Sequence, residues 1–430
     1  MTWLGYGEEI RRGRVEKYRE YDSVCTPIAR GYFTQTTVGS KGEGLTCFLE
    51  NDVDFLYVMN DVLCVEADID LQTIPDNFHL FRMDTRIHPG HCILLQERPS
   101  QNCLDIITRS LCCNAHGDIL LSSVLWKDNV AQAFSYSPKS VQQQITGPSI
   151  PDTHIGILHV DKVFGLHCRC PSILKEWAAR PRCWPQPVVV QKVVSLGAYA
   201  TPVGVKGSEL NYVEWRICFN TGEAELVNNL NDTQVKVYVL LKMILKEMIK
   251  PTNKEIASYV LKNIVLWQAE NTPQTNVHAR NLCHWLHDGL RELRTVIEKK
   301  SLRYYMIPER NLMANCGLDV AQQRKWVADI TDMLEEGPRV ILRLVKIRRA
   351  IIASPQQMLR FSETRMWLDF LQLESLIRMK QCDNEKLRRD SDYILNAIKR
   401  RRNDILIDVA LRMYQEGSSL SKDLYVRIIQ

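Results

Sequence analysis

The sequence predicts an α+β protein in which a sheet-containing region of mixed structure is followed by a region that is helical almost to its end. Between about residues 35 and 220, short apolar runs alternate with clusters of Gly, Pro, Asn and Asp, as in strands separated by turns. After Phe219 the apolar residues recur at helical spacing. A chain of 430 residues exceeds the usual size of one hydrophobic core, so we expect two or three domains.

Local patterns place the expected elements. Ile10, Val15 and Tyr18 form a thin apolar stripe among acidic and basic residues, which predicts an exposed amphipathic helix over 8–22. Strand candidates are the runs 52–58, 62–67, 91–98, 161–168, 191–203 and 213–219. Helix candidates are 221–229, 232–250, 254–269, 277–299, one capped by Asp319 and ending at Glu336, one from the N-cap Ser354 to about Lys380, and one from about Glu385 or Ser391 to Gln415, before Gly417.

Composition argues against a membrane-spanning or secreted protein. The longest apolar run, 235–249, is interrupted by charged residues, and the N-terminus lacks the apolar core of a signal peptide. We therefore expect a cytoplasmic protein whose 14 cysteines are reduced. No Cys-x-x-Cys pair is present, so buried apolar cysteines are favoured and no structural zinc is expected. The nearest metal candidates are Cys112, Cys113 and His116, and His167, Cys168 and Cys170.

A glycine-rich turn followed by paired acids is the sharpest chemical signal. Residues 39–44 read Gly-Ser-Lys-Gly-Glu-Gly, and Asp52 and Asp54 follow on an apolar run where alternate side chains share a face. Two neighbouring carboxylates repel each other, and a divalent cation relieves that repulsion. Backbone N–H groups and the Ser40 hydroxyl are suited to a phosphate. The combination predicts the metal–phosphate cradle of a nucleotidyltransferase.

A third acid, Asp161, begins another strand candidate and completes a set suited to a two-metal mechanism. Each part alone is weak. Two acids in an Asp-x-Asp pattern are commonly solvated at the end of a strand, and a glycine cluster is often only a flexible loop. The order and spacing of the three parts favour the catalytic interpretation.

The chain carries a series of characteristic blocks in a fixed order: 39–44, 52–54, 81–99, 147–149, 161–182, 184–185, 214–219, 258–267 and 302–313. Together these blocks resemble the cGAS-like receptors, the family of cyclic GMP-AMP synthase. The resemblance covers about residues 8–315 and leaves the last hundred or so residues unplaced. It implies a bilobal nucleotidyltransferase fold with an N-terminal spine helix (1–34), a mixed sheet core (35–220) and a helical lobe (221–318), followed by a helical extension (319–430).

The resemblance also implies roles for individual residues. Gly39 and Ser40 would hold a triphosphate of ATP or GTP, and Asp52, Asp54 and Asp161 would bind two Mg²⁺ or Mn²⁺ ions. Other residues would contact the acceptor base, stack on a base or reach the donor phosphates; these are Arg216, Tyr259 beside Ser258, and Lys242. Two alternatives stay open: Lys242 simply extends from a buried helix to solvent, or Tyr259 belongs to the core.

The family resemblance further implies a ligand-activated innate immune sensor. The product would be a cyclic dinucleotide read by a downstream receptor of the STING type. The vertebrate enzyme grips DNA with a zinc-binding insertion, but residues 220–240 contain neither Cys nor His, so double-stranded RNA is favoured over DNA. The choice of bases and the linkage stay open, because Cys218 and Asn220 replace expected serines. Whether a ligand drives oligomerisation also stays open.

Basic residues suggest where such a ligand would bind. In the family the 8–22 helix lies beside a nucleic-acid groove, so its basic residues become candidates for phosphate contacts, although a solvated helix with internal ion pairs is an equal alternative. Net charge is +5 overall, but residues 337–430 hold 19 Lys and Arg against 11 Asp and Glu. The helix candidates are Arg11, Arg12, Arg14, Lys17 and Arg19.

Two other functions use the same residues. One is a catalytically silent protein that keeps the fold and acts as a binding partner or scaffold. The other is an enzyme that adds nucleotides to RNA ends. The intact set of three acids favours catalysis over the silent form.

Overall fold

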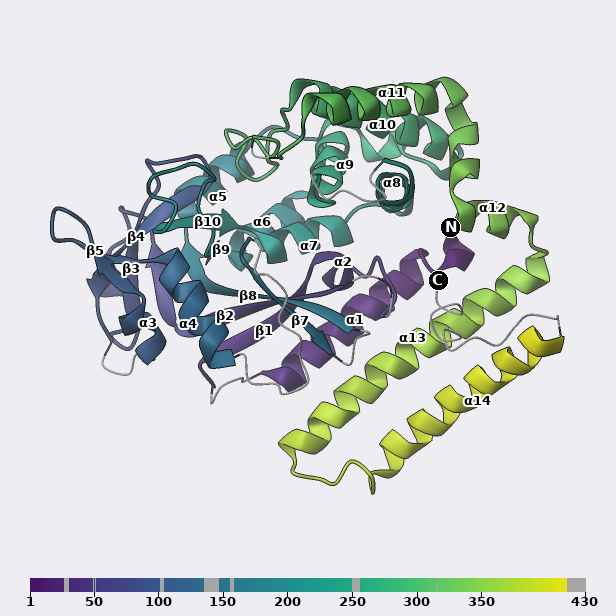
Figure 1. Cartoon of the computed structure of the whole chain (residues 1–430), viewed down its shortest axis with the longest axis horizontal. Coiled ribbons are helices and arrows are strands. Elements are labelled where there is room, and N and C mark those ends of the chain that lie inside the picture. The colour runs from purple at the N-terminus through teal and green to yellow at the C-terminus, as the bar shows by residue number, and fades with distance from the viewer. Residues whose placement is uncertain are drawn as a thin grey trace. The chain divides into compact units, whose positions relative to one another are not determined.

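The computed structural model describes residues 1–26, 31–48, 50, 52–100, 104–134, 147–154, 158–249, 256–314 and 316–415. The chain forms two compact units, each made of separated stretches of sequence (Figure 1). Unit 1 comprises residues 1–60, 134–165 and 353–430, and unit 2 comprises 61–133 and 166–352. These units cut across the four segments that the sequence suggests.

Unit 1 combines a small sheet with long helices from both ends of the chain. Strand β1 (Phe33–Val38) pairs antiparallel with the first half of β2 (Val53–Val65), and β7 (Ser149–His154) pairs antiparallel with the first half of β8 (Leu158–Arg169). The helices are α1 (Glu8–Cys25), the short α2 (Gly39–Gly42), α13 (Pro355–Asn384) and α14 (Tyr393–Gln415). Helices α13 and α14 run side by side (Figure 1), and their contact buries Leu368 against Ile405, Leu406 and Val409.

Unit 2 contains the rest of the sheet. The second half of β2 pairs parallel with β3 (His79–Asp84), followed by β4 (His91–Arg98), β10 (Glu214–Cys218), β9 (Ala198–Thr201) and the second half of β8, all antiparallel to their neighbours. Two short strands, β5 (Leu111–Cys113) and β6 (Ile119–Leu121), join at β4. Four helices accompany these strands: α3 (Asp105–Arg109), α4 (Ser123–Phe134), α5 (Pro171–Ala179) and α6 (Pro187–Leu196).

The remainder of unit 2 is helical, as the sequence predicts after Phe219. Helix α8 begins with a capping box, in which the Asn231 side chain accepts from the Gln234 N–H, and its buried apolar residues run all round. Helix α10 is strongly amphipathic and packs beside α8 and α11 (Figure 1). The helices are α7 (Asn220–Asn228), α8 (Asp232–Ile244, continued by a π turn over Leu245–Ile249), α9 (Tyr259–Asn271), α10 (Leu282–Lys299), α11 (Val320–Glu336) and α12 (Val345–Ile352).

Most predicted elements are confirmed, but several bounds differ. The helices predicted from 254 and from 277 begin at Tyr259 and Leu282. The strand runs 52–58 and 62–67 are one continuous strand, β2. The predicted strand over 191–203 is wrong in its first half, because α6 extends to Leu196 and only Ala198–Thr201 is strand. Residue 254 itself and Gly417 lie outside the described residues.

The described helices and cysteines bear on two expectations from the sequence. No described helix is both long and apolar enough to cross a membrane. The described cysteines are free thiols, most of them buried, in line with their interpretation as small apolar side chains.

Candidate active site

Gly39 and Asp54 meet where β1 turns into α2. Val38, the last residue of β1, lies opposite Asp54 on β2 in the antiparallel register. Gly39 has a φ of +64°, and a Cβ at this position would lie 2.2 Å from the Asp54 carboxylate oxygen Oδ2. Only glycine both adopts this backbone conformation readily and leaves room for the carboxylate. The Gly-Ser turn therefore lies directly against the strand that carries Asp54.

The other predicted cradle residues differ from one another in environment. Ser40 is half-buried in the single turn of α2, and Asp52 is exposed just before β2 begins. Asp161 is the fourth residue of β8 instead of its first, and its Oδ1 accepts a hydrogen bond from the Ser149 hydroxyl at 3.2 Å. Asp52, Asp54 and Asp161 all belong to unit 1.

The three acids are not gathered into a metal site. Within the described ranges, no three His, Cys, Asp or Glu side chains lie close enough together to hold a metal ion. Mg²⁺ prefers carboxylate oxygens as ligands, so these three residues are of the right chemical type. Their side chains, however, do not lie close enough together to share an ion. A two-metal site at these residues therefore requires the carboxylates to move together.

The segment between the glycine turn and Asp52 is fixed by a residue of the turn itself. Lys41 is fully buried, and its ammonium donates to the backbone carbonyls of Cys47, Phe48 and Glu50, the last two at 2.8 and 2.6 Å. Three carbonyl acceptors replace the water that a buried ammonium loses, although burial still lowers the pKa of Lys41 to about 8. No pattern in the sequence predicts this role for Lys41.

Unit 2 holds the predicted base- and phosphate-contacting residues. Arg216 lies on β10, and its Nε is buried with no hydrogen-bond partner in the described structure. Tyr259 opens α9 and keeps 41% of its surface exposed, which excludes the alternative that it belongs to the core; Ser258 before it is also exposed. Lys242 is half-buried on α8, with its ammonium 5.3 Å from the ring centroid of Tyr238.

Arg216 belongs to a basic cluster that sequence reasoning missed. Arg216 pairs in register with His91 on β4, and the Arg310 side chain lies over the neighbouring Gly90. The Arg310 guanidinium lies 5.1 Å from the ring centroid of Tyr304, whose hydroxyl donates to Glu223 at 2.7 Å. Burial and then the charge of Arg216 lower the pKa of Arg310, and burial and Arg310 lower that of His91 to about 4. Arg310 lies in the 302–313 block, but no spacing pattern connects it with β10.

The expected nucleic-acid contacts on α1 are corrected in part. Arg14 is 1% exposed and its Nε donates to Asp369 of α13 at 2.6 Å, so it cannot face a phosphate, and Arg11 is also buried. Lys17 forms ion pairs with Glu20 and with Glu374 of α13. Only Arg12, which is paired with Glu8, and Arg19 are exposed as predicted. The physical reason is that α13, which the sequence could not place, covers this side of α1.

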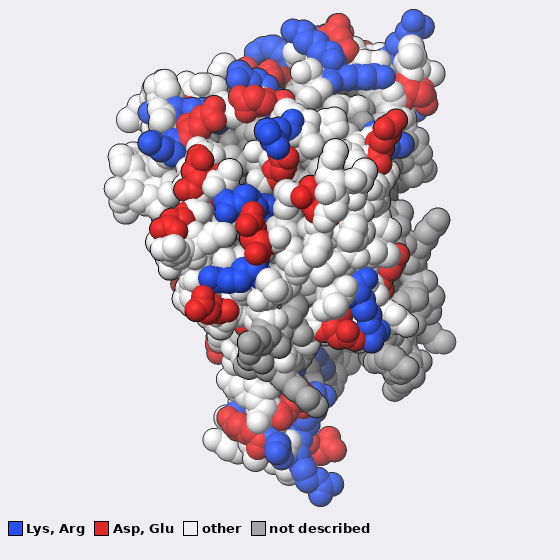
Figure 2. Space-filling model, turned by 90° about the vertical axis from the view of Figure 1, so that its left-hand side faces the viewer, with Lys and Arg blue, Asp and Glu red and all other residues white. Residues whose placement is uncertain are grey.

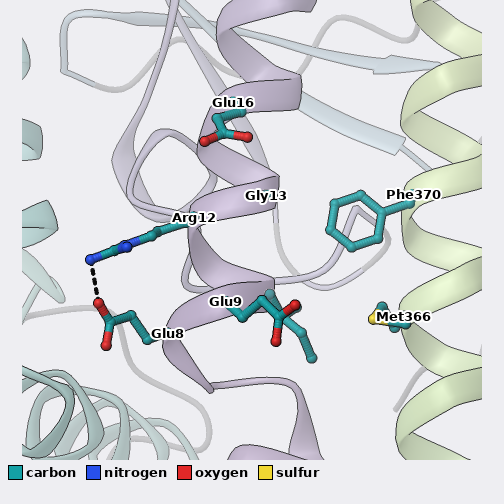
Figure 3. Close-up of a pocket in the computed structure, with 8 residues that line it drawn as sticks. Glu8, Glu9, Arg12, Gly13, Glu16, Met366 and Phe370 are labelled. Atoms are coloured by element: carbon teal, nitrogen blue, oxygen red, sulfur yellow. Dashed lines mark ion pairs between the residues drawn. The ribbon is translucent and has the colours of Figure 1, made fainter.

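A hollow of about 610 Å³ lies beside α1 and α13 (Figure 3). Three carboxylates, from Glu8, Glu9 and Glu16, line it together with the single guanidinium of Arg12, so the lining carries a net negative charge. Met366 and Phe370 lie on the α13 side. Phosphates would be repelled by this lining. Figure 2 shows acidic and basic side chains interspersed on the face it presents, without a broad field of one sign among the described residues there.

One stretch of unit 2 resembles a known protein family. Residues 233–331 match the family model of the Mab-21 protein HhH/H2TH-like domain. The Mab-21 family belongs to the cGAS-like nucleotidyltransferase superfamily, which agrees with the resemblance at that coarser level. No curated protein matches the chain. The matched region begins in α8, ends in α11 and includes Lys242, Tyr259 and Arg310.

Proposed function

We propose that this protein is a nucleotidyltransferase that joins ATP and/or GTP into a cyclic dinucleotide, in response to double-stranded nucleic acid and with RNA favoured over DNA. We place it in the cytoplasm as an innate immune sensor whose product a downstream receptor of the STING type would read. The observation that carries the catalytic part is the contact of Gly39 with the Asp54 carboxylate.

The proposed chemistry assigns separate tasks to the two units. In unit 1, the backbone at Gly39 and the Ser40 hydroxyl bind the triphosphate, and Asp52, Asp54 and Asp161 hold Mg²⁺ or Mn²⁺ once the nucleotide draws them together. The bound cations would neutralise phosphate charge and lower the pKa of the attacking hydroxyl. In unit 2, Tyr259 stacks on a base and Lys242 contacts phosphate. Arg216 donates to the acceptor base through the fork that includes its buried Nε.

A second candidate function is favoured by a different observation. The three carboxylates do not form a metal-binding group within the described residues, as expected of a fold that binds ligands without catalysing transfer. In that case the same cradle would bind a nucleotide, and the helical extension would act as a scaffold. The two functions differ in whether pyrophosphate is released.

The deciding experiment incubates the full chain with labelled ATP and GTP, Mg²⁺ or Mn²⁺, and a panel of double-stranded RNA, double-stranded DNA or neither. We expect a small cyclic product, identified by mass spectrometry and nuclease digestion, with RNA as the strongest activator. Asp54→Asn should reduce its formation at least about 100-fold, because it removes a proposed metal ligand. Asp61→Asn, also on β2, is the matched control and should retain activity.

Three other outcomes would change the proposal. A lengthened RNA primer in place of a small product would indicate an RNA-end nucleotidyltransferase. Stimulation by DNA alone would overturn the choice of RNA. No product with any metal or polymer, combined with nucleotide binding in a direct assay, would favour the silent binding protein.

A further inference from the structure

A buried charged cluster in unit 1 joins the C-terminal extension to the segment that leads to the catalytic acids. Arg14 comes from α1, Arg365 and Asp369 come from α13, and Glu50 lies two residues before Asp52. The side chains of Arg14, Arg365 and Asp369 are 1–2% exposed and that of Glu50 is 13% exposed. Two positive charges and two negative charges are thus removed from water together.

The two carboxylate oxygens of Asp369 accept hydrogen bonds from two different parts of the chain. Asp369 Oδ2 accepts from Arg14 Nε at 2.6 Å, and Asp369 Oδ1 accepts from the backbone N–H of Phe48 at 2.7 Å. Arg365 extends the connection, because its Nη2 lies 2.6 Å from Glu50 Oε1. The guanidiniums of Arg14 and Arg365 also contact the Cys47 sulfur, at 3.0 and 2.9 Å.

Cys47, Phe48 and Glu50 are therefore held from two sides. From the glycine turn, the Lys41 ammonium donates to the backbone carbonyls of Phe48 and Glu50. From α13, Asp369 accepts from the Phe48 N–H and Arg365 pairs with the Glu50 carboxylate. The Phe48 ring is buried with Tyr18 of α1 and Leu373 of α13. Removing charges from water is costly, and hydrophobic side chains of similar size stabilise a core at least as well. Added stability therefore does not explain these buried charges. Their hydrogen bonds instead fix one particular arrangement of α1, α13 and the residues before Asp52.

The partners of α1 are informative as well. Asp369 and Glu374 of α13 pair with Arg14 and Lys17, two of the residues that the sequence assigns to phosphate contacts. A carboxylate presents oxygen acceptors to a guanidinium much as a phosphate does. The extension thus supplies from within the chain the anionic groups that a nucleic acid would supply at this helix.

We propose that Asp369 and Arg365 of the C-terminal extension are positioning residues that fix Cys47, Phe48 and Glu50, and through them Asp52, without a nucleic acid on this face of α1. Their effect on catalysis rests on the proposed nucleotidyltransferase function; their effect on the segment does not. The proposal moves any activating polymer away from the buried side of α1.

Hydrogen exchange on the full chain tests the positioning role directly. In Asp369→Asn, we expect the amides of residues 45–53 to exchange at least about tenfold faster than in the wild type, because the Phe48 N–H loses a charged acceptor. Peptides from α10 in unit 2 should keep their protection, which shows that the chain is folded. The control is Asp383→Asn, also on α13, which breaks an exposed pair with Arg389 in the turn after the helix and should change nothing in 45–53. Unchanged exchange of 45–53 in Asp369→Asn would overturn the proposal.

A second variant separates positioning from mere stability. Arg14→Met combined with Asp369→Leu replaces the ion pair by apolar side chains, which restores thermal stability in other buried pairs. We expect the melting temperature to return toward that of the wild type while exchange at 45–53 stays fast, since Leu cannot accept from the Phe48 N–H. If protection returned together with stability, the cluster would be only a packing feature.

Activity adds a third readout. In the nucleotide assay, Asp369→Asn should lower kcat at least about tenfold with little change in KM, since the substrate contacts are intact but the acids are displaced. If the wild type makes no product, the proposed function fails while the exchange result still decides whether α13 fixes the segment. Wild-type kcat in Asp369→Asn together with fast exchange would overturn the link to Asp52.

Discussion

Gly39 shows how much a single backbone position contributes to the candidate site. Its left-handed conformation and its contact with Asp54 are separate demands, and glycine meets both. Gly117 has a φ of +85° but nothing within 4 Å of the position that a Cβ would take, so it shares only the first demand. The pair therefore separates backbone strain from steric conflict.

We predict that Gly39→Ala destabilises unit 1 by about 2–3 kcal/mol and abolishes nucleotide transfer, because the methyl group displaces the Asp54 carboxylate. Gly117→Ala should cost only about 1 kcal/mol and leave activity intact. Denaturant unfolding and the nucleotide assay measure the two effects. Equal losses of activity in both variants would contradict a specific role for the Gly39–Asp54 contact.

His79 should make stability depend on pH. Its ring is 3% exposed, its Nδ1 accepts from the Ser100 N–H at 3.4 Å, and burial lowers its pKa to about 4. The unfolded chain binds a proton near the ordinary value of about 6.5, so the folded state is disfavoured as pH falls from about 6.5 to 4.

We therefore predict that the free energy of unfolding falls by about 2 kcal/mol less in His79→Gln than in the wild type between pH 6.5 and 4. Denaturant unfolding at a series of pH values measures this difference. From about one pH unit above 6.5 this contribution is constant, because the ring is then neutral in both states. His116→Gln, at an exposed position, should leave the profile as it is. A profile that His79→Gln leaves unchanged would place the acid sensitivity elsewhere.

At the scale of elements, the approach of α1 to α13 depends on Gly13. A Cβ at Gly13 would lie 2.8 Å from the Phe370 ring, closer than carbon atoms pack. Figure 3 shows Phe370 directed from α13 toward this part of α1. A glycine inside a helix usually costs stability, and here the close packing of two helices offsets that cost.

We predict that Gly13→Ala destabilises the protein by about 1–2 kcal/mol, although Gly→Ala in an ordinary helix stabilises by about 1 kcal/mol. Adding Phe370→Leu should recover part of the loss, because the smaller side chain leaves room for the methyl group. Thermal unfolding of the single and double variants measures this coupling. A stabilising Gly13→Ala would mean that α1 and α13 are not in close contact.

Elements with local signals could be predicted from the sequence. Asp319 and Ser354 cap α11 and α13 as expected, each accepting from the backbone N–H three residues later. The strand predicted at 191–196 failed because its β-branched residues suit either structure, while Pro187 at the first turn and Gly197 after the last mark a helix.

The candidate site was predictable only where its residues are close in sequence. The Gly-Ser turn and the paired acids are separated by a dozen residues, and their contact follows from a simple register. The true environment of Arg14 could not be predicted, since its partner Asp369 lies 355 residues away. Arg310 was missed for the same reason, because only the folded chain brings it over Gly90 beside β10.

For the whole molecule, the burial of Arg14 changes where a nucleic acid would bind. Arg400 and Arg401 on α14 are exposed and belong to the basic part of the sequence. They lie within the same unit as the proposed cradle. Phosphate contacts by these residues would add a salt-dependent affinity.

We predict that Arg400→Gln/Arg401→Gln lowers the affinity for double-stranded RNA about tenfold at low salt and reduces the salt slope by about two. Arg360→Gln, which removes an exposed arginine of α13, should have little effect. Fluorescence anisotropy across a salt series measures both quantities. If the two variants behaved alike, the binding would be a general charge effect and not a site on α14.

The discontinuous build of unit 1 has a consequence for how the chain folds during synthesis. Its first 60 residues need helices that begin at Pro355, so most of the protein must leave the ribosome before Arg14 and Cys47 can be covered. Until then a nascent chain exposes an arginine, a thiol and the Phe48 ring that the finished molecule buries. Late closure of such long-range contacts slows folding and favours association with chaperones. Messages truncated before α13 should therefore yield chains that aggregate or are degraded, even though every residue of the proposed cradle has been translated.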